Sequence, residues 1–305
     1  MTRFTLKNSI KNRDMTIFDV LDQHGNELTE EQKRQIERKL NEMLSYRARI
    51  GVLGKTGAGK SSLCNALFGK EICQVSDVAA CTRDTKDVLL NIGRDQGITL
   101  VDVPGVGESG ERDKEYEALY RKLLPELDAV LWVLKADDRA YSIDIDFYKS
   151  LVKPYLDAGK PFIVVLNQVD KIEPYREWQE AERRPGPKQA QNIEAKINVV
   201  AAEFGLKQSL IIPVSAEEKF GLCRLIDELI FSLPDEKKVG VFNHVPRENR
   251  SVAATEEVKG SLERTIGNVL SGAAKGAAIG ARFGGKAGAV VGAVVGGLGG
   301  LFGFF

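Results

Sequence analysis

Eight residues from Gly54 to Ser61, with the sequence GKTGAGKS, have the types and spacing of a phosphate-binding loop. In such a loop, backbone N–H groups of a glycine-rich turn point at the β-phosphate, and the next helix starts with its positive dipole end towards the same oxygens. Lys60 would reach the β- and γ-phosphates, and Ser61 would offer its hydroxyl to Mg²⁺. The residues expected to contact the phosphates are Gly54, Lys55, Thr56, Gly57, Ala58, Gly59, Lys60, Ser61 and Ser62.

The elements on both sides of this loop are those that a phosphate site requires. Residues 48–53 form a short apolar run that predicts a buried strand, and residues 62–68 carry Leu63, Ala66 and Leu67 on one face of a predicted helix. A chance match in an ordinary glycine turn would not need this strand and helix. The sequence therefore predicts a nucleoside triphosphate site.

A second group of polar residues follows a later strand and would select the base. Asn167-Gln168-Val169-Asp170 comes directly after the apolar run 162–166, at the sheet edge where ligands bind in open α/β folds. The Asp170 carboxylate can accept hydrogen bonds from N1–H and N2–H₂ of guanine, a donor pair that adenine lacks. Asn167 would tie this loop to the phosphate loop, and a backbone N–H of Ser215–Ala216 would lie near guanine O6. We therefore expect GTP and GDP as ligands.

The segment between these two groups carries the residues expected at Mg²⁺ and the γ-phosphate. Asp102 ends a predicted strand and would hold Mg²⁺ through water, while the Gly105 N–H would contact the γ-phosphate. Thr82 would close over the γ-phosphate, contacting Mg²⁺ and the attacking water, with Thr85 as a rival. Ser61, Thr82 and Asp102 form the predicted metal site, and Lys60, Thr82 and Gly105 the predicted hydrolytic site.

The apolar pattern predicts an α/β fold with a doubly wound, mostly parallel sheet. Strands are expected at 48–53, 87–92, 98–103, 129–135, 161–167 and 210–214, with helices between most of them. The predicted organisation is an N-terminal helical segment (1–46), a nucleotide-binding domain (47–234), a linker (235–258) and a C-terminal glycine-rich segment (259–305). A capping box, Thr29 with Gln32, predicts the start of the N-terminal helix.

Composition adds two expectations. Lysine plus arginine equal aspartate plus glutamate at 43 each, so no overall field attracts nucleic acid, and we expect no direct nucleic-acid partner. Four cysteines without metal-ligand spacing and an N-terminus without an apolar signal favour a cytoplasmic protein, peripheral to or inserted in the inner face of a membrane only through its C-terminus.

With these motifs in order, residues 48–233 resemble the Era/TrmE-like (YfjP-type) P-loop small GTPases. The run CTRDT at 81–85 is similar to the TTRD segment of that branch, while GKTGAGKSS with DVPG is also similar to immunity-related and septin-like GTPases. The resemblance implies binding of GTP and Mg²⁺, slow hydrolysis of GTP to GDP, and switch segments at about 77–86 and 105–116. Two positions depart from it: Val106 cannot orient water as a glutamine does, and Gly57 replaces the asparagine of potassium-activated relatives.

The hydrolytic site would then lack a cation. We expect it to come from self-association, in a homodimer across the nucleotide site, or from a partner, with Arg83 and Arg112 as candidates in the switch segments. The alternative, which the sequence favours, is that both arginines are plain surface charges.

Beyond Lys259 glycine recurs at every fourth position from 272 to 300, which places eight glycines on one helical stripe. Small residues at this spacing allow close helix packing in lipid, and Ala287–Phe305 holds no charged residue. Residues 272–305 are therefore expected to associate with a membrane or with each other. A hairpin that packs in water and a disordered tail remain alternatives.

The leading hypothesis is a GTPase whose nucleotide state controls this membrane-associating segment. The alternatives are an Era-like GTPase acting on the ribosome or RNA and a non-hydrolysing, GTP-dependent scaffold.

Overall fold

The computed structural model describes residues 21, 28–46, 48–68, 89–91, 99–102, 121, 124–139, 141–157, 159–270, 291–297 and 299. The chain divides into two compact units. One comprises Arg47–Leu233 and His244–Ser251, and the other takes in the residues before 47, Pro234–Asn243 and those from Val252 onward. The first unit is an α/β structure and the second is helical.

In the described part of the chain, the α/β unit contains a sheet of six strands in the order β2-β3-β1-β4-β5-β6. Their bounds are β1 (Arg49–Leu53), β2 (Leu89–Asn91), β3 (Thr99–Asp102), β4 (Ala129–Lys135), β5 (Phe162–Asn167) and β6 (Ile211–Val214). All neighbours are parallel except β2, which runs antiparallel to β3 at one edge. β4 and β5 lie inside the sheet and are buried almost throughout, as their continuous apolar sequences require.

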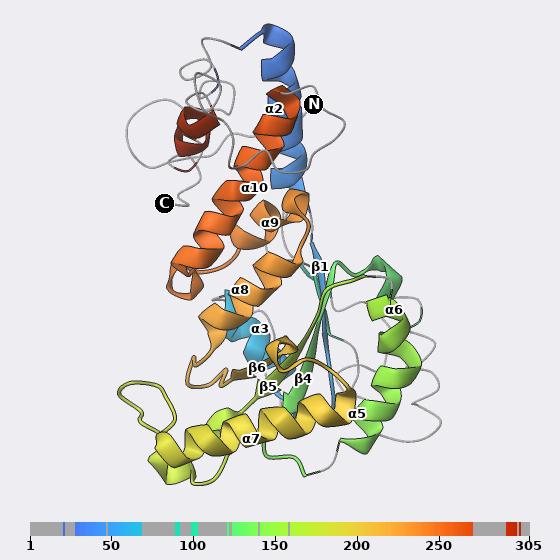
Figure 1. Ribbon diagram of the computed structural model, residues 1–305, viewed down its shortest axis with the longest axis vertical. Helices are drawn as coiled ribbons and strands as arrows, with labels where there is room; N and C mark the ends of the chain where they lie inside the picture. The colour runs from blue at the N-terminus through green and yellow to red at the C-terminus, as the bar shows by residue number, and fades with distance from the viewer. Residues whose placement is uncertain are drawn as a thin grey trace. The chain divides into compact units, whose positions relative to one another are not determined.

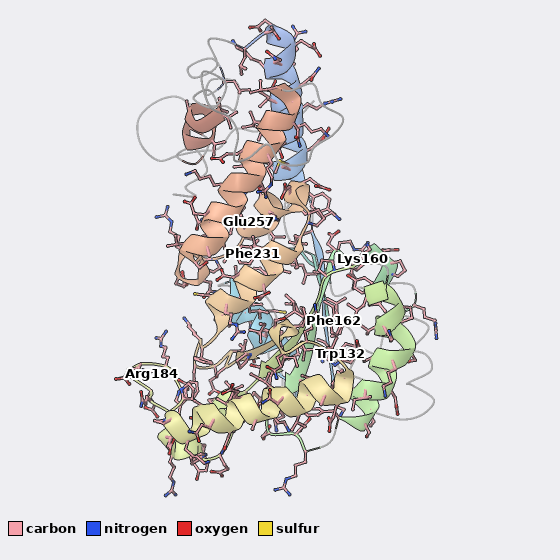
Figure 2. The ribbon with its side chains drawn as sticks, viewed as in Figure 1. Trp132, Lys160, Phe162, Arg184, Phe231 and Glu257 are labelled. Carbon is pink, nitrogen blue, oxygen red and sulfur yellow. The ribbon has the colours of Figure 1, made fainter. Side chains whose placement is uncertain are left out.

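Helices cover both faces of this sheet (Figure 1). α3 (Lys60–Phe68) and α8 (Leu222–Ser232) pack together, and with β1, β5 and β6. A second layer contains α5 (Ser142–Phe147), a π-helical turn (Tyr148–Val152), α6 (Lys153–Asp157) and α7 (Pro187–Phe204). Its aromatic side chains contact Trp132 and Phe162, which are labelled in Figure 2 and lie in the buried core. The predicted doubly wound, mostly parallel α/β fold is confirmed.

The helical unit joins α2 (Glu30–Ser45), α9 (Asp235–Phe242) and α10 (Val252–Leu270), which pack on one another. The predicted capping box is present: Gln32 N–H donates to Thr29 Oγ1 at 3.2 Å, and Thr29 N–H donates to Gln32 Oε1 at 3.0 Å. α9 approaches the end of α2 closely, because a Cβ on Gly240 would lie 2.8 Å from the carbonyl oxygen of Tyr46. Glycine therefore allows this contact.

The structure differs from the predicted linker at 235–258. This stretch contains all of α9 and the start of α10. Several of its apolar residues are buried, among them Val239, Phe242 and Val258. Ion pairs join α9 to α10: Asp235 accepts two hydrogen bonds from Arg264 at 2.6 and 2.7 Å, and Lys238 pairs with Glu257. The apolar pattern of this stretch is weak because ion pairs form much of the interface between α9 and α10.

The glycine-rich segment lies largely outside the described residues. Residues 291–297 are helical, with Val291, Val294 and Val295 buried and Gly292 and Gly296 exposed. Within the described part of the chain, no helix has the length and apolar character needed to cross a membrane. The expectations for 271–290 fall on residues outside that part.

Candidate guanine-nucleotide site

The loop from Gly54 to Gly59 connects β1 to α3 in a conformation that needs glycine. Gly54, Gly57 and Gly59 have φ values of 140°, 82° and 86°, which side chains disfavour. A Cβ on Gly54 would collide with the carbonyl oxygen of Val133, and one on Gly59 would collide with the Asn167 amide. Among the described residues other than its chain neighbours, no atom lies within 4 Å of a Cβ built on Gly57, so there the backbone angle selects glycine. The loop is thus a compact turn at the carboxyl end of β1.

The Lys60 side chain folds back over this loop. Its Nζ donates to the carbonyl oxygens of Gly54 at 3.0 Å and Lys55 at 3.2 Å. Lys60 is also the first residue of α3, and Ser61 and Ser62 follow in the same turn. An ammonium group and a helix N-terminus therefore lie at one loop, which fits the binding of a polyphosphate.

Asn167, at the end of β5, joins three loops. Its Nδ2 donates to Ala58 O in the phosphate loop at 2.9 Å, and its Oδ1 accepts from the backbone N–H of Ala216 at 3.2 Å. The side chain is 1% exposed, so these bonds are shielded from water. Gln168 adds a further bond, from Nε2 to Gly57 O at 3.1 Å. The predicted contact of Asn167 with the phosphate loop is present, and Gln168 forms a second contact that was not predicted.

Asp170 follows in the same loop. Its carbonyl oxygen accepts a hydrogen bond from Gln189 Nε2 at 3.0 Å, and Gln189 also donates to Ile172 O at 2.9 Å. Within the described residues the buried Oδ1 of Asp170 has no hydrogen-bond partner. A carboxylate oxygen left in this state is suited to a ligand that offers N–H donors.

The loop after β6 brings Ser215 and Ala216 beside Asn167. Ser215 forms a two-way backbone pair with Phe220, at 3.1 and 3.0 Å, and its Oγ accepts from Glu218 N–H at 3.1 Å. The Ala216 N–H predicted near guanine O6 donates here to Asn167 Oδ1. The contact to O6 stays a prediction.

The metal and hydrolytic residues are described only in part. Asp102 ends β3, in register with Val52 of β1, so its backbone lies next to the strand that leads into the phosphate loop. Thr82, Thr85 and Gly105 lie outside the described residues, as do Arg83, Val106 and Arg112. The donor set expected for Mg²⁺, a serine hydroxyl with a carboxylate, suits a hard cation. Ser61 and Asp102 occupy the ends of adjacent elements that would supply it.

Three residues that contact elements of the site were not predicted. Asp144 of α5 forms an ion pair with Lys55 of the phosphate loop, at 2.7 Å between Nζ and Oδ2. Gln189 of α7 holds the Asp170 loop, and Asn249 donates to Ala66 O at 2.8 Å and Leu67 O at 3.0 Å, near the end of α3. No motif marks these residues, because each acts on a loop or helix that is distant in sequence.

Comparison with known proteins identifies the family. A family model described as a 50S ribosome-binding GTPase matches residues 49–168. YkfA of Escherichia coli K12 is 40% identical over 232 residues, which cover 76% of this chain and 78% of YkfA. The chain belongs to the family of YkfA and YfjP. YfjP of the same organism is likewise 40% identical, over 236 residues, 76% of this chain and 78% of YfjP. GTPase Era of Aquifex aeolicus is 25% identical over 240 residues, 74% of this chain and 73% of Era.

The match to GTPase Era and to the GTPase family model agrees with the resemblance expected from the sequence. The matched range 49–168 includes the phosphate loop, Asp102 and Asn167. The protein is a GTPase that binds guanine nucleotides and hydrolyses GTP. The similarity to immunity-related GTPases stays an expectation.

Proposed function

We propose that this GTPase hydrolyses GTP slowly with Mg²⁺ and acts as a nucleotide switch on its C-terminal segment. In this proposal Lys60 and the N–H groups from Gly54 to Ser62 bind the phosphates, and Asp170 selects guanine. Ser61, Asp102 and Thr82 hold Mg²⁺, which when bound neutralises charge on the β- and γ-phosphates. The observation that supports this best is the double contact of Asn167 with Ala58 and Ala216, because it joins phosphate-binding and base-binding loops into one site.

The chain's own residues would act mainly by positioning. Lys60 already lies over the loop, where the carbonyl oxygens of Gly54 and Lys55 hold its ammonium group, so little rearrangement is needed to meet a phosphate. The Gly105 N–H would stabilise charge on the γ-phosphate. Val106 offers no group to orient water, which is why we expect intrinsic rates on the order of 10⁻⁴ to 10⁻² per second.

Binding of labelled GDP and GTP, together with phosphate release, tests this function. Lys60→Ala should weaken nucleotide binding by roughly ten- to a hundredfold, because it removes a charged contact. Asp170→Asn should favour xanthosine over guanosine nucleotides, since the amide matches the N1–H donor and O2 acceptor of xanthine. Lys149→Ala and Asp146→Asn, at exposed positions, are the matched controls. Equal retention of ATP and GTP by the unmodified protein would refute the assignment.

Two finer parts of the proposal concern partners. Residues 272–305 would associate with a membrane or with each other in one nucleotide state, which liposome flotation with GTP, GDP and a non-hydrolysable analogue tests against a chain ending at Leu270, the last residue of α10. A homodimer across the site would supply the missing cation. In that case the single-turnover rate per molecule rises with protein concentration, whereas a constant rate excludes self-stimulation.

A ribosomal role is the second candidate function, because the matching family model is described as ribosome-binding. Co-sedimentation with 50S subunits in the presence of GTP, and not GDP, would support it. Binding to liposomes without binding to subunits would support the membrane switch instead. A scaffold that does not hydrolyse GTP would bind GTP and release no phosphate in either case.

A further inference from the structure

The segment between β5 and α7 forms part of the wall of a cavity next to Asp170. The cavity has a volume of about 360 Å³ and is lined by Asp170, Lys171, Tyr175, Trp178 and Glu218. Arg184, labelled in Figure 2, pairs with Gln179 across the turn in this segment. Trp178 of this segment therefore lies in the wall of a cavity that the base-selecting residue Asp170 also lines.

Trp178 links the two loops expected to surround the base. Its ring packs edge-on against Phe220, with 5.6 Å between ring centroids and 84° between ring planes. Phe220 is the backbone partner of Ser215, in the loop after β6. Asp170, in the loop after β5, lines the same cavity as Trp178. The indole therefore lies between the element that would read guanine O6 and the one that would read N1 and N2.

This segment is held firmly to the rest of the site. Glu177 Oε2 accepts hydrogen bonds from the first free N–H groups of α7, those of Lys188 at 2.9 Å and Gln189 at 3.1 Å. A carboxylate at this position also suits the helix dipole. Gln189 in turn donates to the carbonyl oxygen of Asp170. Glu177, next to Trp178 in the sequence, thus stabilises the base-selecting loop around Asp170 through α7.

Two buried polar atoms, in residues that line this cavity, have complementary hydrogen-bonding roles and no partner among the described residues. They are Oδ1 of Asp170, an acceptor, and Nε1 of Trp178, a donor. Buried polar atoms in native proteins are almost always paired, so an unpaired acceptor and an unpaired donor in residues of one cavity fit a ligand that offers the opposite groups. Guanosine offers donors at N1 and N2 and acceptors at N3 and the ribose oxygens, so it can satisfy both.

We propose that Trp178 is a nucleoside-contacting residue of this GTPase, in addition to Asp170. Its ring forms a wall of the guanosine end of the site, and its N–H donates to the bound nucleoside. This proposal rests on the guanine-nucleotide site proposed above. It assigns a specificity role to a residue that lies outside the phosphate loop and outside the NQVD segment.

The chain contains two tryptophans, Trp132 and Trp178, and this makes the proposal testable by fluorescence. Trp132 is fully buried in the core, so its emission should not respond to nucleotide. We expect saturating Mg²⁺ and GDP to change tryptophan emission and to reduce its quenching by iodide, in the unmodified protein and in Trp132→Phe. Trp178→Phe should abolish both responses. If Trp132→Phe fails to fold, the comparison of the unmodified protein with Trp178→Phe gives the same answer.

Affinity provides the second measurement. Trp178→Phe keeps a ring and removes the N–H, so GDP affinity measured by retention of labelled GDP should fall roughly three- to tenfold, with the thermal midpoint unchanged. The affinity for inorganic tripolyphosphate, which has no nucleoside, should be the same in Trp178→Phe and in the unmodified protein. If the unmodified protein retains GDP but tryptophan emission stays constant and Trp178→Phe binds GDP equally well, this proposal is overturned and the nucleotide site stands. If the unmodified protein retains no GDP, both fall.

Discussion

Lys55 Nζ lies 2.7 Å from Oδ2 of Asp144, which makes an ion pair between the phosphate loop and α5. The Asp144 side chain is 1% exposed, and burial raises the pKa of its carboxyl above the ordinary value while the Lys55 ammonium opposes that shift. The Lys55 carbonyl oxygen also accepts a hydrogen bond from Lys60. The buried Asp144 carboxylate thus holds Lys55 in place, and the carbonyl oxygen of Lys55 accepts a hydrogen bond from the phosphate-binding Lys60.

Replacing Asp144 tests the importance of this pair. Asp144→Asn should destabilise the protein by about 3 to 5 kcal/mol, because it leaves the Lys55 ammonium partly buried without its counter-charge. GDP should also dissociate faster, since the backbone at Lys55 is less restrained. Urea unfolding and the GDP off-rate are the measurements. Asp146→Asn, an exposed change on the same helix, should alter neither, and equal effects of the two variants would contradict this interpretation.

Asn167→Ala should weaken GDP binding and lower stability together. The change leaves Ala58 O and Ala216 N–H without their shared partner, at about 1 to 3 kcal/mol for each buried group. Asn167→Asp keeps the acceptor for Ala216 and loses the donor to Ala58, so its effect on the phosphate loop should remain. Calorimetric titration with GDP distinguishes the variants. Asn198→Ala, at an exposed site on α7, serves as the control.

Asn249 should stabilise the helix that follows the phosphate loop. Its Nδ2 donates to the carbonyl oxygens of Ala66 and Leu67, and the side chain is nearly buried. Asn249→Ala should cost about 1 to 3 kcal/mol of unfolding free energy. Asn249→Asp should cost more, because a carboxylate would face carbonyl oxygens at the negative end of α3. Chemical denaturation measures both, and the reverse order of the two would show that charge plays no part there.

The ion pairs of the helical unit should make it sensitive to acid. The two hydrogen bonds from Arg264 hold the pKa of Asp235 below its usual value of 3.8, with Lys238 acting in the same direction. Because the folded-state pKa is lowered, this stabilisation is present above pH 4 to 5 and is lost as the pH falls through the folded pKa. Urea unfolding of Asp235→Asn should therefore show a smaller loss of stability between pH 6 and pH 3. An unchanged pH dependence would mean that the pair contributes nothing, as many half-exposed pairs do.

The sequence was sufficient to predict a strand or a helix wherever neighbouring residues determine its structure. The continuous apolar runs of β4 and β5 predict strands buried on both faces, and the structure confirms them at 129–135 and 162–167. The helix α2 starts at its predicted capping box, because Thr29 and Gln32 satisfy each other's backbone groups within one turn. The order of the phosphate loop and NQVD along the chain likewise predicted which loops meet, since the carboxyl ends of parallel strands share one edge of the sheet.

Tertiary structure alone decided which distant side chains complete the site and where the chain divides. Asp144, Trp178, Gln189 and Asn249 have no special spacing, and their roles come from partners that folding brings close. Residues 235–258 gave a weak helical pattern because Val239, Phe242 and Val258 are helical through burial against other helices rather than through local periodicity. Backbone propensity and apolar period act over a few residues, whereas a buried polar group takes whichever partner the packed fold supplies.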